Sequence, residues 1–361
     1  MSSWVSRRNG GVFEAVVAQA DILHSLGAVP VVLGIEDEAA AQDGWRIEGI
    51  ERQLAKPHGP AAIAYAPELR SLLDAAQLDL LHLHGIWQYP VKAAGDWAQR
   101  TGKPLVVSPH GMLAPWITSR NAWKKNIARA LWEQGAWRKA SLFHALTQAE
   151  TADIAREVPA ASTVSIPNAA PPARMSSAAS RGPVALYLGR IHEKKNLGGL
   201  IAAWVKARDR LPPEASLVIA GWGDNAGIAA LEQALPGAAG AGVEFVGTAF
   251  GSQKAALFDL ARFLVLPSHS EGLPMAVLEA WAEGIPALMS SNCNLPEGFA
   301  SGAAIDCGTS VDDITAALVD GFTLSDEAWK RMSSAAKSLA LGPFSRDAVA
   351  QRWEAAYAGL L

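Results

Sequence analysis

Arg190 and Lys195 flank a turn that follows a short apolar run, and two cations at this spacing are suited to binding a diphosphate. A diphosphate requires positive charge and also backbone N–H groups that donate hydrogen bonds to its oxygens. Residues 272–275 (Gly-Leu-Pro-Met) are suited to supply those donors, because glycine allows close approach and proline is favoured as the first residue of a helix. We therefore predict a diphosphate site formed by Arg190, Lys195 and the amides of Leu273 and Met275.

Glu271 and Glu279 lie on either side of the same segment and are suited to binding hydroxyl groups. A carboxylate can accept hydrogen bonds from two adjacent sugar hydroxyls. Taken alone, two glutamates at this spacing are more often explained by a charge at a helix N-terminus and a residue on a solvated helix face. Together with Arg190 and Lys195, the set instead indicates a site for a sugar attached to a diphosphate.

Short apolar runs alternate with helical patterns along the chain, and this alternation predicts parallel β-sheets flanked by helices. The runs are too short for buried helices, and several are rich in Val, Ile and Leu. The predicted strands are residues 29–35, 78–83, 104–108, 141–146 and 163–166 in the first half and 184–188, 217–220, 243–246, 263–266 and 285–289 in the second. Two such series predict an α/β protein with two doubly wound, Rossmann-like domains.

The length of 361 residues fits two domains, and a segment rich in alanine, serine and proline marks the boundary between them. This segment, residues 169–183 (AAPPARMSSAASRGP), lacks the pattern of a helix or a strand. The last residues of the chain have a helical pattern with Val349 and Trp353 on one face. We predict a first domain at 1–170, a linker at 171–183, a second domain at 184–344 and a C-terminal helix at 345–361.

Glycines and histidines follow several of the predicted strands, at the edge where parallel sheets bind ligands. The residues in these positions are Gly10, Gly11, His84, His110, Gly221 and Gly223. Two such edges facing each other would form a cleft between the domains, and we expect His84, Gly221 and Gly223 to line it.

The composition excludes several classes of protein. Hydrophobic residues make up 50% of the chain, charged residues make up 18% and the formal net charge is −4, so neither a disordered chain nor a strongly basic nucleic-acid-binding protein is expected. The two cysteines, Cys293 and Cys307, form no Cys-x-x-Cys pair, which argues against a disulfide scaffold and a cysteine-rich zinc site. No apolar run approaches the ~18 residues of a membrane-spanning helix, so the sequence predicts a cytoplasmic protein.

Four segments of the sequence resemble the motifs of one enzyme family, in the same order along the chain. Residues 267–288 (PSHSEGLPMAVLEAWAEGIPAL) resemble the Glu-x7-Glu signature of retaining glycosyltransferase family 4, which has the GT-B fold. Residues 186–197 (LYLGRIHEKKNL) are similar to the Arg-x4-Lys diphosphate clamp of that family. Residues 8–16 (RNGGVFEAV) and 108–113 (SPHGML) resemble its N-terminal glycine loop and its first-domain His-Gly segment.

The resemblance implies a role for each matched residue. Arg190 and Lys195 would bind the diphosphate of a nucleotide sugar. Glu271 would contact the hydroxyls of the donor sugar, Glu279 would contact the ribose, and His110 would lie beside the donor sugar at the reacting face. Further positions would supply amides (Leu273 and Met275), border the base (Val246, Gly247 and Thr248) or let the first helix approach the phosphate (Gly10 and Gly11).

The same resemblance implies a retaining hexosyltransferase of the bacterial polysaccharide-assembly branch. Its donor would be a UDP- or GDP-sugar, its acceptor a glycan or lipid-linked saccharide, and its C-terminal helix would cross back to the first domain. The family reaction is a front-face attack in which the leaving phosphate assists deprotonation of the acceptor. Neither a metal ion nor a further cofactor is therefore expected, and the sequence contains no Asp-x-Asp pair to hold a metal.

Two positions depart from the family pattern. Only residues 1–6 (MSSWVS) precede the glycine pair, where the family has a full apolar strand, which predicts either a very short first strand or missing residues. Asn196 follows Lys195 at a position where glycine is frequent.

Three other interpretations stay open at the level of the sequence. Residues 221–226 (GWGDNA) match the G-x-G-x-x-A pattern of a nicotinamide dehydrogenase, with Glu244 downstream, although this interpretation leaves Arg190 unexplained. A non-catalytic scaffold that binds nucleotide sugars would keep the same motifs. His82 and His84 alternate on one strand and could bind zinc, although a buried His82 and a ligand-facing His84 are favoured.

Residues 115–140 combine tryptophans with positive charge. Trp116, Trp123 and Trp137 recur at multiples of seven residues, which predicts one helical face, and the segment carries six basic residues against Glu133 alone. One interpretation is a basic amphipathic surface that contacts an anionic membrane. The other is a buried helix face with an ordinary solvated basic side.

Overall fold

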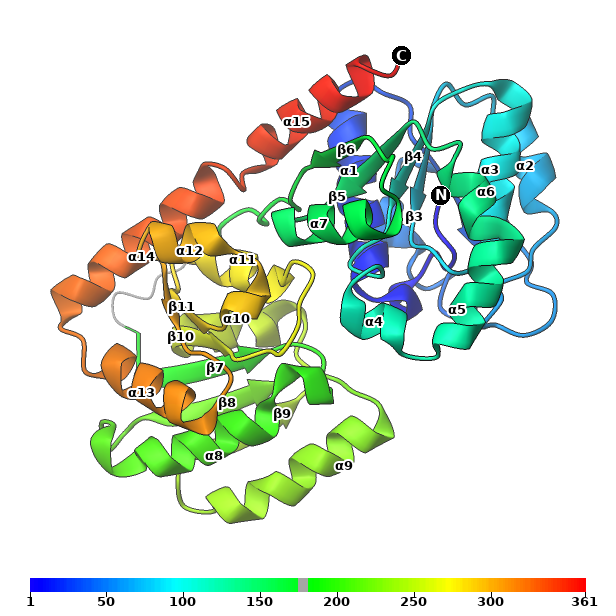
Figure 1. The fold of residues 1–361 in the computed structure, drawn as a ribbon. Coiled ribbons are helices and arrows are strands. Elements are labelled where there is room, and N and C mark those ends of the chain that lie inside the picture. The colour runs from blue at the N-terminus through cyan, green and yellow to red at the C-terminus, as the bar shows by residue number, and fades with distance from the viewer. Residues whose placement is uncertain (175–180) are drawn as a thin grey trace. The chain divides into compact units, whose positions relative to one another are not determined.

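The structure is a computed structural model that describes residues 1–174 and 181–361, so residues 175–180 of the predicted linker lie outside the described residues. Within the described residues the chain forms two compact units (Figure 1). The first unit comprises Met1–Asn168 and Arg346–Leu361, and the second comprises Ala169–Ser345. The last helix of the chain is therefore part of the first unit.

The first unit contains parallel strands in two groups that the N-terminal segment joins. One group is β1 (Val31–Ile35) with β2 (Glu51–Ala55), and the other is β3 (Leu81–His84), β4 (Leu105–Ser108), β5 (Leu142–Ala145) and β6 (Thr163–Ser165), in that order. Ser2 bridges to His84 of β3 and Trp4 bridges to Ile35 of β1, both in parallel orientation. The segment before the glycine pair therefore bridges β1 and β3 through isolated pairs and does not form a regular strand of its own.

Gly34 of β1 allows this segment to lie close to its neighbour. A Cβ atom at position 34 would lie 2.4 Å from Cγ2 of Val5 and 2.6 Å from the carbonyl oxygen of Ser2. The Ile35 N–H donates to the carbonyl oxygen of Ser3 at 2.9 Å, and the His84 N–H donates to that of Met1 at 2.8 Å. Any larger residue at position 34 would push the segment out of its place in the sheet.

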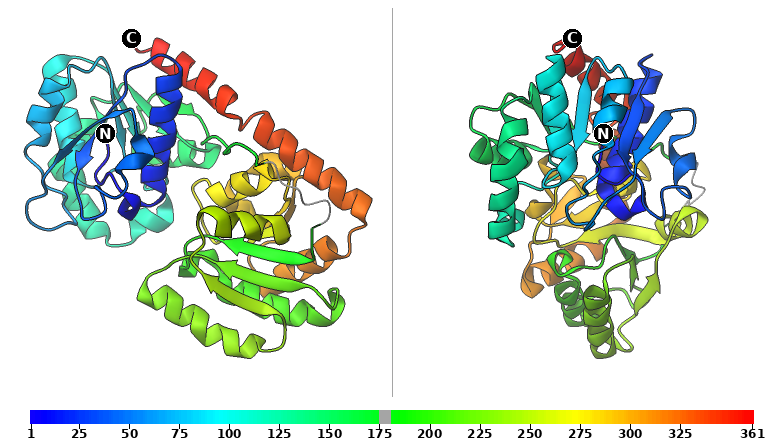
Figure 2. Two further views of the ribbon diagram at one scale, coloured as in Figure 1. Left: turned by 180° about the vertical axis from the view of Figure 1, so that it is seen from behind. Right: turned by 90° about the vertical axis from the view of Figure 1, so that its right-hand side faces the viewer.

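Helices cover both faces of this sheet (Figures 1 and 2). Leu33 and Val32 are adjacent in β1 and belong to two different hydrophobic clusters, which also contain Trp97 and Phe13 respectively, because successive side chains of a strand point to opposite faces. The helices are α1 (Gly11–Ser25), α2 (Leu69–Ala75), α3 (Tyr89–Thr101), α4 (Pro115–Ser119), α5 (Ala122–Ala128), α6 (Gln134–Trp137), α7 (Gln148–Glu157) and α15 (Arg346–Ala358). A π-helical turn, Arg129–Glu133, joins α5 to α6.

The second unit is built on one six-stranded parallel sheet with the order β12-β11-β10-β7-β8-β9. The strands are β7 (Val184–Leu188), β8 (Ser216–Ala220), β9 (Val243–Gly247), β10 (Ala261–Leu266), β11 (Ala287–Met289) and β12 (Ala304–Asp306). The chain begins this sheet in the middle and adds strands first on one side and then on the other, which defines a doubly wound fold. Tyr187, Trp204 and Trp281 are fully buried in its core.

Seven α-helices of the described residues flank this sheet. They are α8 (Leu197–Ala207), α9 (Asn225–Ala234), α10 (Gly251–Leu260), α11 (Met275–Ala282), α12 (Pro296–Ala300), α13 (Val311–Phe322) and α14 (Asp326–Leu341). The α/β architecture with two parallel, doubly wound units confirms the predicted fold class.

Two strands, β2 and β12, are absent from the prediction. β2 (ERQLA) carries only two apolar residues and pairs on one side only, as an edge strand. β12 has three residues and likewise ends its sheet. One of these strands is mostly polar and the other has only three residues, so both sequences lack the apolar run by which the predicted strands were recognised.

Candidate functional site

Lys195 and Glu271, which the sequence places far apart, form a buried ion pair in the second unit. Lys195 Nζ donates to Oε1 of Glu271, and Ser268 Oγ donates to the same oxygen at 2.7 Å. The side chains of Lys195 and Glu271 are only 11% and 6% exposed. Removing two charges from water is costly, so the pair persists because each charge compensates the other and Ser268 adds a further hydrogen bond.

The backbone around Glu271 is held by the loop that follows β11. Asn294 Nδ2 donates to the carbonyl oxygen of Glu271 at 2.7 Å, and the Glu271 N–H donates to that of Asn292 at 3.1 Å. Ser290 Oγ donates to the carbonyl oxygen of Ser268 at 2.6 Å. Sequence reasoning named Glu271 but none of these supporting residues, because their partners come from a different loop.

Asn196, at the position where the family pattern has glycine, adopts a left-handed backbone conformation with φ 58°. Asparagine tolerates this conformation better than most residues. Its side-chain Nδ2 also donates to the carbonyl oxygens of Pro267 at 3.2 Å and Thr309 at 2.8 Å. Asn196 thereby ties the Lys195 loop to the loop after β10 that leads to Glu271.

Replacing Asn196 with glycine is expected to lower the free energy of unfolding of the second unit by about 1–3 kcal/mol. Glycine accepts the same φ but removes two hydrogen bonds, each worth about 0.5–1.5 kcal/mol. Urea unfolding would measure the change. Asn121→Gly is the matched control, because Asn121 has φ 51° and a side chain that does not cap its helix. Equal effects of the two substitutions would contradict the tethering role of Asn196.

Arg190 takes no part in the ion pair between Lys195 and Glu271. Its guanidinium is 3.5 Å from a carboxylate oxygen of Asp224 and lies over the ring of Trp222, 5.5 Å from the ring centroid. Leu273 and Met275 lie at the start of α11, where Pro274 is the N-cap residue. The predicted residues thus lie in the loop between β7 and α8 and around the start of α11. Of these residues, the structure pairs Lys195 with Glu271.

A cavity of about 190 Å³ gathers a second group of the predicted residues. Gly221, Thr248 and Glu279 line it together with the unpredicted Lys254, whose Nζ is 2.6 Å from Oε2 of Glu279. The Gly221 N–H donates to the carbonyl oxygen of Gly247 at 2.8 Å, which holds the ends of β8 and β9 together. The volume suits one ring system of a ligand rather than a whole nucleotide sugar.

A larger cavity of about 580 Å³ in the same unit lies between α8 and α9, with His192, Asn196 and Asp224 among its lining residues. None of the predicted site residues lines it. We place the candidate site at the Lys195–Glu271 pair and at the smaller cavity, because each of them holds charged groups that can bind phosphate or hydroxyl groups. Volume alone does not identify a site.

Gly221 and Gly223 are required by the backbone of the neighbouring loop. A Cβ atom at Gly221 would lie 1.8 Å from the carbonyl oxygen of Gly189, and one at Gly223 would lie 2.5 Å from that of Ile191. In a dinucleotide fold the glycines make room for a pyrophosphate, whereas here protein backbone occupies the space. The glycine pattern therefore has a structural cause that does not involve a nicotinamide cofactor.

His110 of the first unit has a left-handed backbone with φ 55°, a conformation that is uncommon outside glycine and often found at functional sites. Its Nε2 is 3.0 Å from Nδ1 of His84, and the two rings stack. Burial, reinforced by His144, lowers the pKa of His110 to about 3. The side chain is therefore a neutral imidazole at physiological pH, able to donate or accept a hydrogen bond.

Glu150 of α7 fixes the turn that carries His110. The Gly111 N–H donates to Glu150 Oε1 at 2.6 Å, and the Leu146 N–H donates to Glu150 Oε2 at 2.8 Å. The pattern Thr147-x-x-Glu150 marks a helix start in the sequence, since Thr147 Oγ1 accepts from the Glu150 N–H. This pattern does not indicate that the Glu150 carboxylate contacts the turn that carries His110. The sequence analysis therefore did not identify Glu150 as a residue of the site.

A chain of buried side chains beneath His84 has a single consistent proton order. The ring nitrogen Nε2 of His144 donates to the carbonyl oxygen of Ile166 at 2.7 Å, because that oxygen can only accept. His144 Nδ1 must then accept from Ser108 Oγ at 2.7 Å, and Ser108 accepts from His82 Nε2 at 2.6 Å. His82 Nδ1 in turn accepts from the hydroxyl of Tyr357 in α15 at 2.6 Å. Both nitrogens of His82 are thus used, which argues against a zinc ligand there.

No group of three or more His, Cys, Asp or Glu side chains is arranged to hold a metal ion in the described ranges 1–174 and 181–361. In the same residues no helix has the length and apolar character required to cross a membrane.

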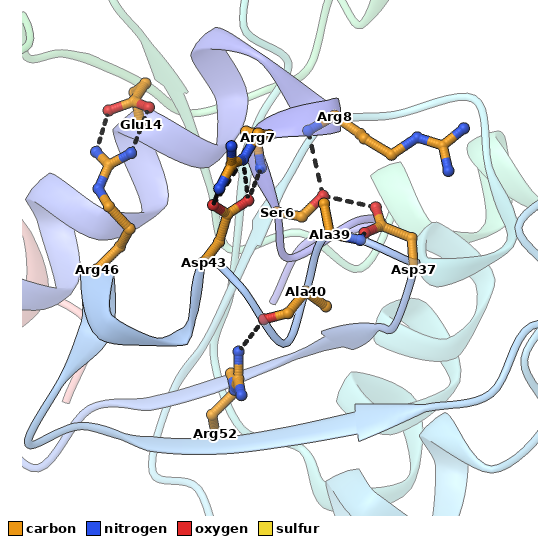
Figure 3. A network of polar contacts seen from close by, with 10 residues as sticks. All are labelled: Ser6, Arg7, Arg8, Glu14, Asp37, Ala39, Ala40, Asp43, Arg46 and Arg52. Atoms are coloured by element: carbon orange, nitrogen blue, oxygen red, sulfur yellow. Dashed lines mark hydrogen bonds and ion pairs between the residues drawn. The ribbon is translucent and has the colours of Figure 1, made fainter. Parts of the chain in front are cut away.

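The glycine pair at positions 10 and 11 begins α1, and Figure 3 shows the polar contacts that hold the preceding turn. The Arg7 N–H donates to Asp43 Oδ2 at 2.7 Å, and Arg7 Nε donates to Asp43 Oδ1 at 2.7 Å. The hydrogen bonds from Arg7 lower the pKa of the Asp43 carboxyl below its ordinary value. Gly10 has φ 55°, and a Cβ atom at Gly10 or Gly11 would have no atom within 4 Å, so the space beside the turn is open.

The tryptophan segment is not one continuous helical face. It is divided into α4, α5, a π-helical turn and α6, and the extra residue of the π-turn breaks the seven-residue period. Trp123 is 63% exposed, whereas Trp137 is buried. The predicted single face with Trp137 is therefore wrong, while Trp123, Ile127 and Leu131 form an exposed apolar row at four-residue spacing.

Comparison with known proteins identifies the class. Residues 10–169 match the family model described as "Glycosyl transferase 4-like domain", and residues 182–323 match "Glycosyl transferases group 1". The two matched segments together cover most of both units. The chain therefore belongs to the glycosyltransferases that these two models describe. Because the chain is a glycosyltransferase, the interpretation as a nicotinamide dehydrogenase is excluded.

The relatives are consistent with that assignment. Anabaena HepE, in a crystal structure with UDP and glucose, has 16% identity and a TM-score of 0.77, covering 99% of each chain. The lipopolysaccharide outer core galactosyltransferase WaaB has 16% identity and a TM-score of 0.70, covering 100% of this chain and 98% of WaaB. These likenesses establish the GT-B fold.

One curated relative is similar in sequence. The O-antigen chain mannosyltransferase B of Escherichia coli is 28% identical over 158 residues, which cover 42% of this chain. The match spans only 39% of the length of that mannosyltransferase.

Proposed function

We propose that the protein transfers a hexose from a nucleotide diphospho-sugar to a glycan or lipid-linked saccharide, with retention of configuration, in the synthesis of a cell-surface polysaccharide. The observation that carries the proposal is the buried Lys195–Glu271 pair with its Ser268 hydrogen bond. It places a cation for phosphate beside a carboxylate for sugar hydroxyls. The crystallised complex of HepE with UDP and glucose and the hexosyltransferase names of the other relatives support this donor class.

The residues of the candidate site supply the needs of this reaction. Lys195 and Arg190 would stabilise the charge that develops on the leaving diphosphate. Glu271 would accept hydrogen bonds from the sugar, and the neutral His110 would donate a hydrogen bond to the sugar at the reacting face. The bond between the anomeric carbon and the phosphate oxygen breaks, the acceptor oxygen bonds to the same face, and its proton passes to the released phosphate. These residues would provide charge stabilisation without a further cofactor.

A thermal-shift panel of UDP, GDP, ADP, CMP and NAD, with and without their sugars, tests the donor class. A ligand present at 100 times its Kd raises the stability by about 2.7 kcal/mol. We expect one nucleoside diphosphate to raise the Tm by several degrees, and Lys195→Ala to lose that shift. A shift with NAD alone, or with no nucleotide, would contradict the proposal.

A non-catalytic scaffold that binds nucleotide sugars is the second candidate function, because it would retain the same pair. The measurement that separates the two is release of nucleoside diphosphate from the stabilising donor in the presence of a saccharide acceptor. Release that depends on the acceptor supports the transferase, and its absence across hexose donors supports the scaffold.

We further propose that the protein contacts an anionic membrane surface through residues 115–140. Trp123, Ile127 and Leu131 are exposed, and Lys124 is exposed beside them, with its Nζ 5.5 Å from the centroid of the Trp123 ring. Exposed aromatic and aliphatic side chains flanked by cations are typical of helices that lie at a lipid interface.

Co-sedimentation with vesicles containing anionic lipid at low salt is expected for the wild-type protein and is expected to be lost in Trp123→Ser/Ile127→Ser. Trp45→Ser is the matched control, because Trp45 is 70% exposed and lies outside this segment. Equal loss in the control, or no sedimentation of the wild type, would overturn the membrane proposal.

A further inference from the structure

The ion pair between Lys254 and Glu279 joins α10 to α11 at the wall of the smaller cavity. Lys254 Nζ lies 2.6 Å from Glu279 Oε2, and the two side chains are 29% and 22% exposed. Both residues line the cavity of about 190 Å³. The pair is therefore neither fully buried nor free in solvent, and its polar ends border space that a ligand can enter.

The two members of the pair have opposite hydrogen-bonding capacities. The ammonium group of Lys254 can only donate, and the carboxylate of Glu279 can only accept. A pair of adjacent hydroxyl groups matches this arrangement, because each hydroxyl both donates and accepts. One hydroxyl can donate to Glu279 while the neighbouring hydroxyl accepts from Lys254.

We propose that Lys254 completes a clamp for the ribose hydroxyls of the donor nucleotide. Glu279 has in this clamp the role that the family resemblance implies for it, and Lys254 is the residue that makes recognition depend on both hydroxyls. The inference rests on the proposed function, because it assumes a nucleoside diphosphate in this cavity. Lys254 also holds the carboxylate of Glu279 in one orientation before the ligand arrives. The remaining walls of the cavity include Gly189, Gly221 and Thr248.

An ordinary ion pair between two helices is the competing explanation of the same geometry. A partly exposed pair of this kind contributes little to stability, and as a purely structural contact it would not influence the choice of ligand. The two explanations therefore differ in one observable, the preference for ribose over 2′-deoxyribose.

Calorimetric titration with UDP, GDP and their 2′-deoxy forms tests the proposal in the wild type, Lys254→Met and Lys254→Arg. We expect the wild type to bind the ribonucleotide about 10-fold to 100-fold more tightly than the deoxy form. Lys254→Met should lose most of this preference by weakening the ribonucleotide, with little change for the deoxy form. Lys254→Arg keeps donors at this position and should restore part of the preference.

Lys206→Met is the matched control, because Lys206 also pairs with a carboxylate, that of Asp312, but does not line the cavity. It should leave both affinities unchanged. An unchanged preference in Lys254→Met, or equal weakening of both nucleotides, would overturn the clamp while leaving the donor class intact. A wild-type protein that binds none of the four nucleotides would overturn the donor class and the clamp together.

Discussion

Sugar transfer is expected to fall by at least about 10³-fold when Lys195 is replaced by alanine, because the leaving diphosphate loses a cation that stabilises its developing charge. The same substitution leaves the carboxylate of Glu271, whose side chain is only 6% exposed, with Ser268 as the one side-chain hydrogen-bond donor among its contacts in the described residues. Removing one partner of a buried pair costs about 3–5 kcal/mol. We therefore expect Lys195→Ala to remain folded but to unfold at lower denaturant concentration.

The double variant Lys195→Met/Glu271→Leu separates the two effects. It removes both buried charges and replaces them with apolar groups of similar volume, so its stability is expected to exceed that of Lys195→Ala, although it remains inactive. Steady-state transfer assays and urea unfolding of both variants measure the two quantities. Near-normal transfer in either variant would contradict the assignment of Lys195, and a double variant less stable than the single one would contradict the role of the pair.

The first unit is expected to lose stability steeply as the pH falls from about 6.5 to about 4. Burial lowers the pKa of His110 to about 3 and that of His144 to about 4, and it lowers the pKa values of His82 and His84 well below their ordinary range. The unfolded chain binds protons at these histidines near pH 6.5, whereas the folded unit does not. Unfolding therefore takes up protons in this window, and stability falls with falling pH.

Glu133 works in the opposite direction, because burial raises the pKa of its carboxyl to about 8 and the folded unit holds a proton there that the unfolded chain releases above about pH 4.5. Burial also raises the pKa of the Glu150 carboxyl, which acts in the same direction as Glu133, whereas burial lowers the pKa of the Met1 amino group to about 5, which adds to the effect of the histidines.

Hydrogen exchange of the strands of each unit between pH 8 and pH 5, corrected for intrinsic rates, would measure this loss. We expect protection of β3, β4 and β5 to decline well before that of β7, β8 and β10, whose unit contains only the partly exposed His192 and His269. His144→Asn, which removes one titrating ring, should flatten the pH dependence of the first unit. A parallel decline of both units would contradict the histidine explanation.

The sequence predicted the elements whose signals are local. Central strands such as β7 (VALYL) are continuous apolar runs, and the start of α11 is marked by Gly272 and Pro274. The sequence did not predict contacts between side chains of different elements. Lys254 reaches Glu279 from a different helix, and Glu150 reaches Gly111 across 39 positions of sequence. Neither residue belongs to a motif that names its partner, so only the folded chain reveals the pairing.

The tryptophan segment shows why periodicity can mislead. Seven-residue spacing predicted one face only on the assumption of an uninterrupted α-helix, and the π-helical turn Arg129–Glu133 removes that assumption. Trp123 and Trp137 therefore lie in different environments, one exposed and one buried. The identification of the family motifs did not depend on this regularity, because it rested on particular residue types at fixed spacings and not on a helical period.

The place of α15 in the first unit has a consequence for synthesis on the ribosome. Tyr357 hydrogen-bonds to His82, Trp353 packs against the rings of His82 and His144, and Arg346 pairs with Asp21 of α1 at 2.8 Å. Residues 1–168 leave the ribosome before any of these contacts can form, and translation of the remainder takes roughly 10–40 s. During that interval the nascent first unit exposes the surface that α15 later covers, so its core is complete only after α15 has been synthesised.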